Sequence, residues 1–100
     1  PRISDLKMEK TEAEEAFMQS VRNLKLIVQS GRVHGDYSTF NILWHKETAV
    51  AIDFPQVLEF KHNPNAEAFL ERDVRSLCKS FMKQGVNANE LNILREIRKG

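Results

Sequence analysis

The chain has 100 residues, of which 41% are hydrophobic and 29% are charged, and its formal net charge is +1. This length fits one small domain, and the near-neutral charge argues against the basic face of a nucleic-acid-binding module. No apolar run approaches the roughly 20 residues of a membrane-spanning helix, so we expect no membrane partner. The single cysteine, Cys78, cannot form an internal disulfide, which suits a cytoplasmic protein.

The first thirty residues predict an irregular start followed by one amphipathic helix. Residues 1–10 carry only scattered apolar side chains, and they begin without a methionine, so we expect a fragment of a longer protein. Thr11 and Glu14 have the spacing of a capping box, which marks a helix start. The apolar positions after them recur every three or four residues and share one helix face: Phe17, Val21, Leu24 and Val28. Gly31 is expected to end this helix.

The middle of the chain predicts a β-hairpin that follows a polar loop. Residues 33–41 mix turn-forming and polar side chains. Two short β-prone runs come next, over 42–44 and 49–52, and the polar residues 45–48 between them predict a turn. The hairpin therefore lies between two helical regions.

The last third predicts two further helices. Asn63 and Pro64 form a helix start, because proline lacks the N–H that would have no partner there. The helix after them has a wide apolar stripe: Phe69, Leu70, Val74, Leu77, Cys78 and Phe81. Gly85 ends it, and Asn87 with Glu90 predicts the start of a final helix whose inward residues are Leu91, Leu94 and Ile97. The predicted fold class is therefore α+β and mostly α.

The chemistry-bearing motif lies in the loop and the hairpin. His34, Asp36 and Asn41 have the spacing H-x-D-x-x-x-x-N, and an apolar-Asp-Phe run containing Asp53 follows the hairpin. Phosphoryl transfer needs a carboxylate that orients or deprotonates the attacking hydroxyl, and oxygen ligands for a divalent metal. The spacing predicts one such base and two metal ligands on adjacent loops of a rigid hairpin. The alternative is that these residues only satisfy turns and end a strand.

The stretch His34 to Asn41, followed by Ile52-Asp53-Phe54-Pro55-Gln56, resembles the RIO kinases, atypical members of the protein-kinase-like fold. Ser38 stands where ordinary protein kinases have lysine, and Pro55-Gln56 replaces the glycine of D-F-G. The chain then enters a helix without a long activation segment. The stretches around Pro55 and Asn65 lean toward the second RIO subfamily. The resemblance implies that residues 1–100 form a kinase-like C-terminal lobe whose hairpin carries the catalytic and metal-binding loops.

The resemblance also implies a role for each motif residue. Asp36 resembles the catalytic aspartate, and Asn41 and Asp53 resemble the ligands of Mg²⁺ or Mn²⁺. Asp53 further resembles a transient phosphate acceptor. Nucleotide-binding roles, including the apolar floor under the adenine of ATP, are implied for these positions: Ser38, Asn41, Leu43 and Ile52.

The implied partners are the missing kinase N-lobe and a protein substrate or a maturing small ribosomal subunit. The glycine-rich loop, the strand lysine and the hinge of a kinase are absent from residues 1–100, so we expect little activity from this chain alone. An apolar face including Leu43, Ile52 and parts of residues 1–8 is expected to meet the N-lobe and to promote self-association. Two alternative functions stay open: a nucleotide-gated ribosome-assembly factor, and an aminoglycoside-phosphotransferase-like small-molecule kinase, against which Pro55-Gln56 counts.

The histidines and Asp73 are further candidates for chemistry. The spacing of His34, His45 and His62 fits no standard zinc motif. Asp73 lies beside an apolar helix stripe, where a carboxylate must find hydrogen-bond donors or turn to solvent. Because the resemblance implies that an aspartate on this helix binds backbone amides of the catalytic loop, we predict that Asp73 is buried and bonded at His34 or Gly35.

Overall fold

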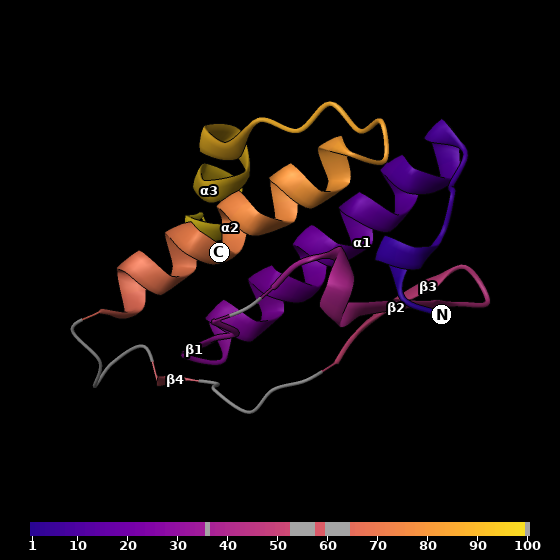
Figure 1. Ribbon diagram of the computed structural model, residues 1–100. Helices are drawn as coiled ribbons and strands as arrows, with labels where there is room; N and C mark the ends of the chain where they lie inside the picture. Colours follow the sequence, from indigo (N-terminus) through magenta and orange to yellow (C-terminus); the bar gives the residue numbers. More distant parts are fainter. Residues whose placement is uncertain (36, 53–57, 60–64, 100) are drawn as a thin grey trace.

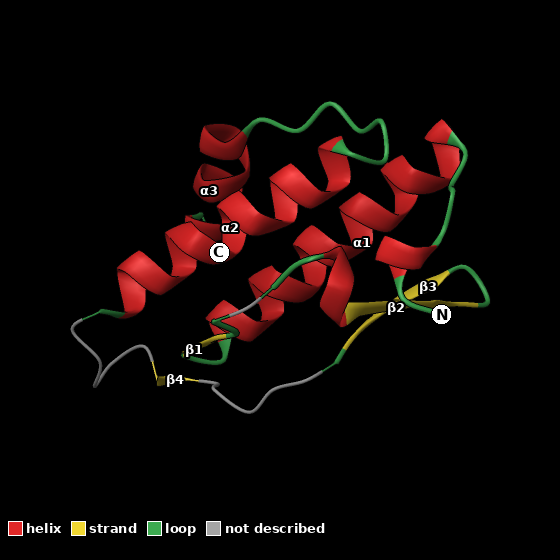
Figure 2. Cartoon of the chain, in the orientation of Figure 1, coloured by secondary structure: helices red, strands yellow, loops and turns green. Residues whose placement is uncertain are grey.

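The computed structural model describes residues 1–35, 37–52, 58–59 and 65–99 (Figure 1). Its described part is mostly helical, with short antiparallel strand pairs, which confirms the α+β class (Figure 2). The elements in chain order are a 3-10 helix η1 (Ile3–Asp5), α1 (Lys10–Gln29), β1 (Arg32–Val33), a 3-10 helix η2 (Thr39–Asn41), β2 (Ile42–His45), β3 (Thr48–Ala51), β4 (Leu58–Glu59), α2 (Ala66–Met82) and α3 (Glu90–Arg98).

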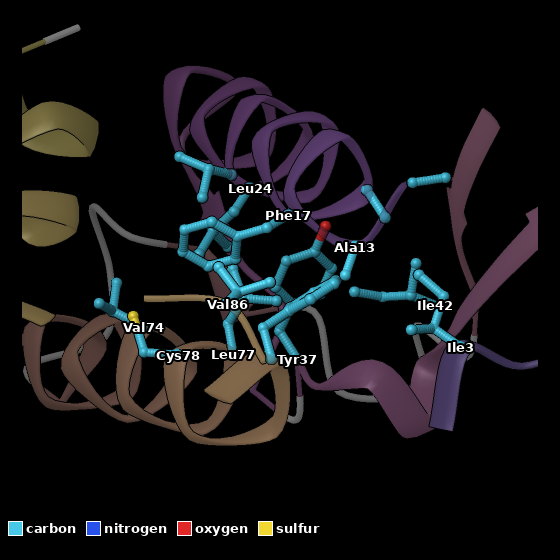
Figure 3. Close-up of a cluster of buried hydrophobic side chains, with 14 of the residues drawn as sticks. Ile3, Ala13, Phe17, Leu24, Tyr37, Ile42, Val74, Leu77, Cys78 and Val86 are labelled. Atoms are coloured by element: carbon cyan, nitrogen blue, oxygen red, sulfur yellow. The ribbon is translucent and has the colours of Figure 1, made fainter. Parts of the chain in front are cut away.

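Helices α1 and α2 run in opposite directions, and the core lies between them (Figures 1 and 3). The rings of Phe17 on α1 and Phe81 on α2 meet edge to face, with centroids 5.2 Å apart. Helix α3 contacts both long helices. The predicted apolar faces are confirmed at these positions, all buried: Phe17, Val21, Leu24, Leu70, Val74, Leu77, Cys78 and Phe81.

Glycines end both long helices, as expected. Gly31 has a φ of 87° and Gly85 a φ of 89°, a left-handed conformation that glycine adopts without the clash of a Cβ atom. Their amides donate to the carbonyls of Val28 and Met82, so each turns the chain immediately after its helix.

The predicted hairpin is confirmed, and its register is fixed from Ile42 opposite Ala51 to His45 opposite Thr48. Its turn residues Lys46 and Glu47 have φ angles of 48° and 60°, the pair of positive values that a two-residue hairpin turn requires. Neither side chain favours that conformation. The side chain of Gln19 on α1 offsets this cost, because it donates to the Glu47 carbonyl and accepts from the Ala49 amide.

Two predicted helix starts differ from the structure. Helix α1 begins at Lys10, with Glu9 in the cap position and no side-chain cap, so the Thr11–Glu14 capping box is wrong: Thr11 already lies inside the helix. Helix α3 begins at Glu90 and is capped by Asn89, whose side chain accepts from the Asn92 amide at 3.1 Å. The predicted Asn87–Glu90 cap is therefore also wrong. The start at Asn63 and Pro64 lies outside the described residues.

The inward face of α3 was predicted only in part. Ile97 is buried and Leu94 is half-buried, but Leu91 is 71% exposed. The register is set by the true cap at Asn89 and by four ion pairs that join α3 to its neighbours: Lys25–Glu96, Arg75–Glu90, Arg98–Glu67 and Arg98–Glu71. This register turns Leu91 toward solvent.

Replacing Asn89 with alanine is expected to cost about 1 kcal/mol of stability, because the Asn92 amide loses its cap. Asn87→Ala is the matched control, since Asn87 is exposed and does not cap α3. Urea denaturation followed by circular dichroism measures both variants. Equal losses would contradict the observed cap.

Candidate active site

A buried carboxylate on α2 holds the loop that contains the motif. Asp73 is fully buried, and one oxygen, Oδ2, accepts from the amides of His34 at 3.1 Å and Gly35 at 2.9 Å. The other, Oδ1, accepts from the amide of Tyr37 at 3.1 Å. The prediction for Asp73 is confirmed, and the Tyr37 bond adds a third amide. These amides lie on both sides of position 36, so α2 fixes the backbone on either side of Asp36.

The charge state of Asp73 reflects two opposed effects. Burial raises the pKa of its carboxyl above the ordinary 3.8, while the hydrogen bonds from the Gly35, Tyr37 and His34 amides act against that shift. The bonded loop is irregular, so its amides have no strand or helix partners of their own. The carboxylate thus gives the loop the hydrogen bonds that its backbone lacks.

His34 and Tyr37 pack the same loop into the core. His34 is 2% exposed, and its Nε2 donates to the Ile52 carbonyl at 3.2 Å, since a carbonyl can only accept. The Tyr37 hydroxyl donates to the Ser20 carbonyl of α1 at 2.7 Å, and Figure 3 shows its oxygen directed toward that helix. Burial raises the pKa of Tyr37 well above its usual value. The loop is thereby tied to α1, to α2 and to the end of the hairpin.

The hairpin brings the chain at Asn41 beside Ile52, the residue before Asp53 in the sequence. The Ile52 amide donates to the Asn41 carbonyl at 2.8 Å, and Asp53 follows Ile52 in the sequence. Asn41 ends η2 and is 3% exposed. The antiparallel register thus places the chain at Asn41 beside the residue that precedes Asp53.

The remaining predicted site residues lie around this corner. Ser38 is half-buried and caps η2, because its Oγ accepts from the Phe40 amide at 3.3 Å. Leu43 and Ile52 are both half-buried. Asp36, Asp53 and the Pro55-Gln56 pair lie outside the described residues. The structure therefore describes these members of the predicted site: Ser38, Asn41, Leu43 and Ile52.

The expected exposed apolar face is partly wrong. Ile3 is fully buried, and Leu6 and Met8 pack against the core. The N-terminal segment lies along the hairpin instead: the Trp44 amide donates to the Pro1 carbonyl at 2.8 Å, and Arg2 pairs with Leu43. The residues of this segment show no strand pattern, because the segment is held by the edge of β2 and not by its own periodicity.

Known protein families and relatives bear on this arrangement. The RIO domain family matches residues 1–94. This chain belongs to the RIO domain family. It is 37% identical over 89 residues to the RIO-type serine/threonine-protein kinase Rio1 of Haloferax volcanii, covering 88% of this chain and 29% of that protein.

The RIO relatives extend across archaea and animals. Rio2 of Methanocaldococcus jannaschii is 33% identical over 87 residues, covering 86% of this chain and 32% of that protein. Human serine/threonine-protein kinase RIO3 is 34% identical over 87 residues, covering 86% of this chain and 17% of that protein. The chain thus spans about a third or less of these relatives. Because proteins named Rio1, Rio2 and RIO3 match at similar identity, the lean toward the second RIO subfamily stays a prediction.

No three histidine, cysteine, aspartate or glutamate side chains among the described residues gather as a metal site. No helix in the described ranges is long and apolar enough to cross a membrane. Cys78 is buried, as expected, and burial, with a smaller effect from the charge of Glu90, raises its pKa to about 11. Its thiol therefore stays protonated and a poor nucleophile near neutral pH.

Sequence reasoning missed two polar contacts, one from α2 and one from the turn after it. Ser80 Oγ on α2 accepts from the Thr39 amide at 3.1 Å. Gln84, two residues after α2 ends, donates from Nε2 to the carbonyls of Ile3 and Leu6, each at 3.1 Å. The available signal for Ser80 was spacing: it follows Asp73 by seven residues, so both share one helix face.

Proposed function

We propose that residues 1–100 are the C-terminal lobe of a RIO-type kinase domain and that the full-length protein transfers the γ-phosphoryl group of ATP with Mg²⁺ or Mn²⁺. The observation that carries this proposal is that the Asp73 carboxylate accepts three hydrogen bonds from backbone amides on both sides of position 36. A loop fixed in this way presents one carboxylate reproducibly, and phosphoryl transfer depends on such positioning. Membership of the RIO family supports this function over that of an aminoglycoside-type kinase.

The proposed chemistry assigns one role to each motif residue. Asp36 takes the proton of the acceptor hydroxyl while the hydroxyl oxygen attacks the γ-phosphorus of ATP and ADP leaves. The Asn41 carboxamide and the Asp53 carboxylate are oxygen donors of the kind that Mg²⁺ prefers, so these two would hold the metal. The metal, when bound, neutralises phosphate charge. Asn41 suits this role because its burial and the Ile52–Asn41 bond fix its backbone.

The outer face of the hairpin fits a proposed nucleotide floor. Leu43 and Val50 face each other across the strands; Leu43 is half-buried and Val50 is 44% exposed. We propose that Leu43 and Ile52 contact adenine, that Ser38 borders the phosphates, and that the missing N-lobe covers this face. Self-association through the same face is the expected alternative when the N-lobe is absent. A cytoplasmic location is proposed as well, in keeping with one free, buried cysteine.

The full-length gene product tests the function directly. Incubated with γ-labelled ATP, Mg²⁺ and a mixture of pre-ribosomal particles and proteins, it should transfer label in a metal-dependent way. Repeated transfer to serine or threonine would support a kinase. A single turnover that leaves acyl phosphate on Asp53 would instead support the nucleotide-gated assembly factor. No labelled product and no ADP would contradict both.

The isolated chain should bind ATP at least about a hundredfold more weakly than the full-length protein, because it lacks the glycine-rich loop, the strand lysine and the hinge. Its ATP turnover should be undetectable. Titration with a fluorescent ATP analogue in Mg²⁺ compares the two proteins. Robust ATPase activity from residues 1–100 alone would contradict the division of the site between two lobes.

A further inference from the structure

Helix α2 and the turn after it bind three separate segments of the chain. Asp73 on α2 binds the loop at 34–37, and Ser80 on α2 binds the turn η2. Gln84, two residues after the end of α2, binds the N-terminal segment. Asp73 was foreseen as an anchor of the first segment, whereas Ser80 contacts the segment that ends in Asn41.

The Ser80 hydroxyl has a defined orientation. It donates to the Leu77 carbonyl, one turn earlier on α2, at 3.0 Å, and this leaves its lone pairs for the Thr39 amide at 3.1 Å. Thr39 is 4% exposed, so little water can replace that acceptor. A buried amide without an acceptor costs about 1–3 kcal/mol.

The turn η2 cannot satisfy the Thr39 amide itself. The Asn41 amide donates to the Ser38 carbonyl at 2.9 Å, and the Phe40 amide donates to Ser38 Oγ. Thr39 is the first residue of this short helix, and the first amides of a helix have no acceptor within it. Ser80 therefore supplies the bond that joins η2 to α2.

We propose that Ser80 is a positioning residue for Asn41: its hydroxyl holds η2 against α2 and so sets where the Asn41 carboxamide meets the metal. This inference rests on the proposed metal role of Asn41. Asn41 lies two residues after Thr39 at the end of the same turn, so movement of the Thr39 amide moves the Asn41 backbone. Asp73 fixes the loop before the turn and does not replace this contact.

The test uses the full-length gene product and Mn²⁺ with a non-hydrolysable ATP analogue, with bound Mn²⁺ measured by electron paramagnetic resonance. Ser80→Ala should weaken Mn²⁺ binding roughly fivefold to tenfold, the effect of losing one buried bond. Ser80→Thr keeps the hydroxyl and should restore the affinity. Ser76→Ala, one turn earlier on α2, should have no effect, because Ser76 shows no bond to the described part of the loop.

Amide hydrogen exchange, measured without metal, tests the Ser80–Thr39 hydrogen bond independently of Mn²⁺ binding. The Thr39 amide should be protected in the unaltered protein and should exchange about tenfold faster in Ser80→Ala. Free exchange in the unaltered protein would overturn the proposal even where Ser80→Ala does not fold. If Asn41→Ala weakens Mn²⁺ binding but Ser80→Ala does not, the role of Ser80 is wrong and the proposed function stands. If Asn41→Ala leaves Mn²⁺ binding unchanged, the metal role of Asn41 fails, and the role of Ser80 fails with it.

Discussion

Replacing Asp73 with alanine is expected to lower the free energy of unfolding by about 3–5 kcal/mol, a large part of the stability of a domain this small. The substitution removes the acceptor of three amides that lie in the interior. Each amide would lose its partner without gaining water. Chemical denaturation of the purified chain measures this loss.

Two control variants separate the loss of the Asp73 hydrogen bonds from the loss of its charge and from the effect of removing any carboxylate from α2. Asp73→Asn keeps one acceptor oxygen and should lose about half as much stability as the alanine variant. Glu71→Ala removes an exposed carboxylate from the same helix, whose ion pair with Arg98 lies in solvent, and should cost less than about 1 kcal/mol. A small loss in Asp73→Ala would contradict the anchoring role.

The pH dependence of stability gives Asp73 a separate signature. Because burial raises the folded pKa above the unfolded value near 3.8, the folded chain holds this proton more tightly. The stability that the raised Asp73 pKa contributes is fully present below the unfolded pKa and is lost as pH rises through the folded pKa. The stability advantage of the unaltered chain over Asp73→Asn should therefore narrow as pH rises. An advantage that widens with pH would mean that the amide bonds outweigh burial.

Replacing Asp36 with alanine in the full-length protein should reduce phosphoryl transfer by about 10²–10⁴-fold, the range for a general base. Affinity for Mg²⁺ and ATP should change little, because the proposed base acts on the acceptor hydroxyl. Asp53→Ala should weaken both transfer and nucleotide affinity, since a metal ligand also contacts the nucleotide through the metal. Kinetic constants together with calorimetric binding separate the two effects.

Folding stability distinguishes these active-site variants from Asp73→Ala. Asp36→Ala should keep the melting temperature of the parent, because the loop backbone is held by Asp73. Glu14→Ala, which removes an exposed carboxylate from α1, is the matched control for both measurements. Equal loss of nucleotide affinity in Asp36→Ala and Asp53→Ala would show that the two aspartates do not divide the roles as proposed.

Local patterns in the sequence predicted most of the fold. Apolar spacing predicted both long helices, Gly31 and Gly85 predicted where they end, and two β-prone runs predicted the hairpin. These signals succeed because a helix face or a hairpin is decided by residues close together in the chain. The burial of Asp73 was predicted as well, because a carboxylate beside a core stripe needs donors.

The sequence by itself thus determined the family, the helices, the hairpin and the spacing of the motif. Only the tertiary structure decided which helix starts are capped, how β1 pairs with β4, and that Leu91 is exposed while Ile3 is buried. It also decided that Ser80 bonds to η2 and that Gln84 bonds to the N-terminal segment. The physical reason is that caps, edge pairing and side-chain partners depend on which segments meet in space, and a hydroxyl or an amide has no distinct pattern until its partner is in place.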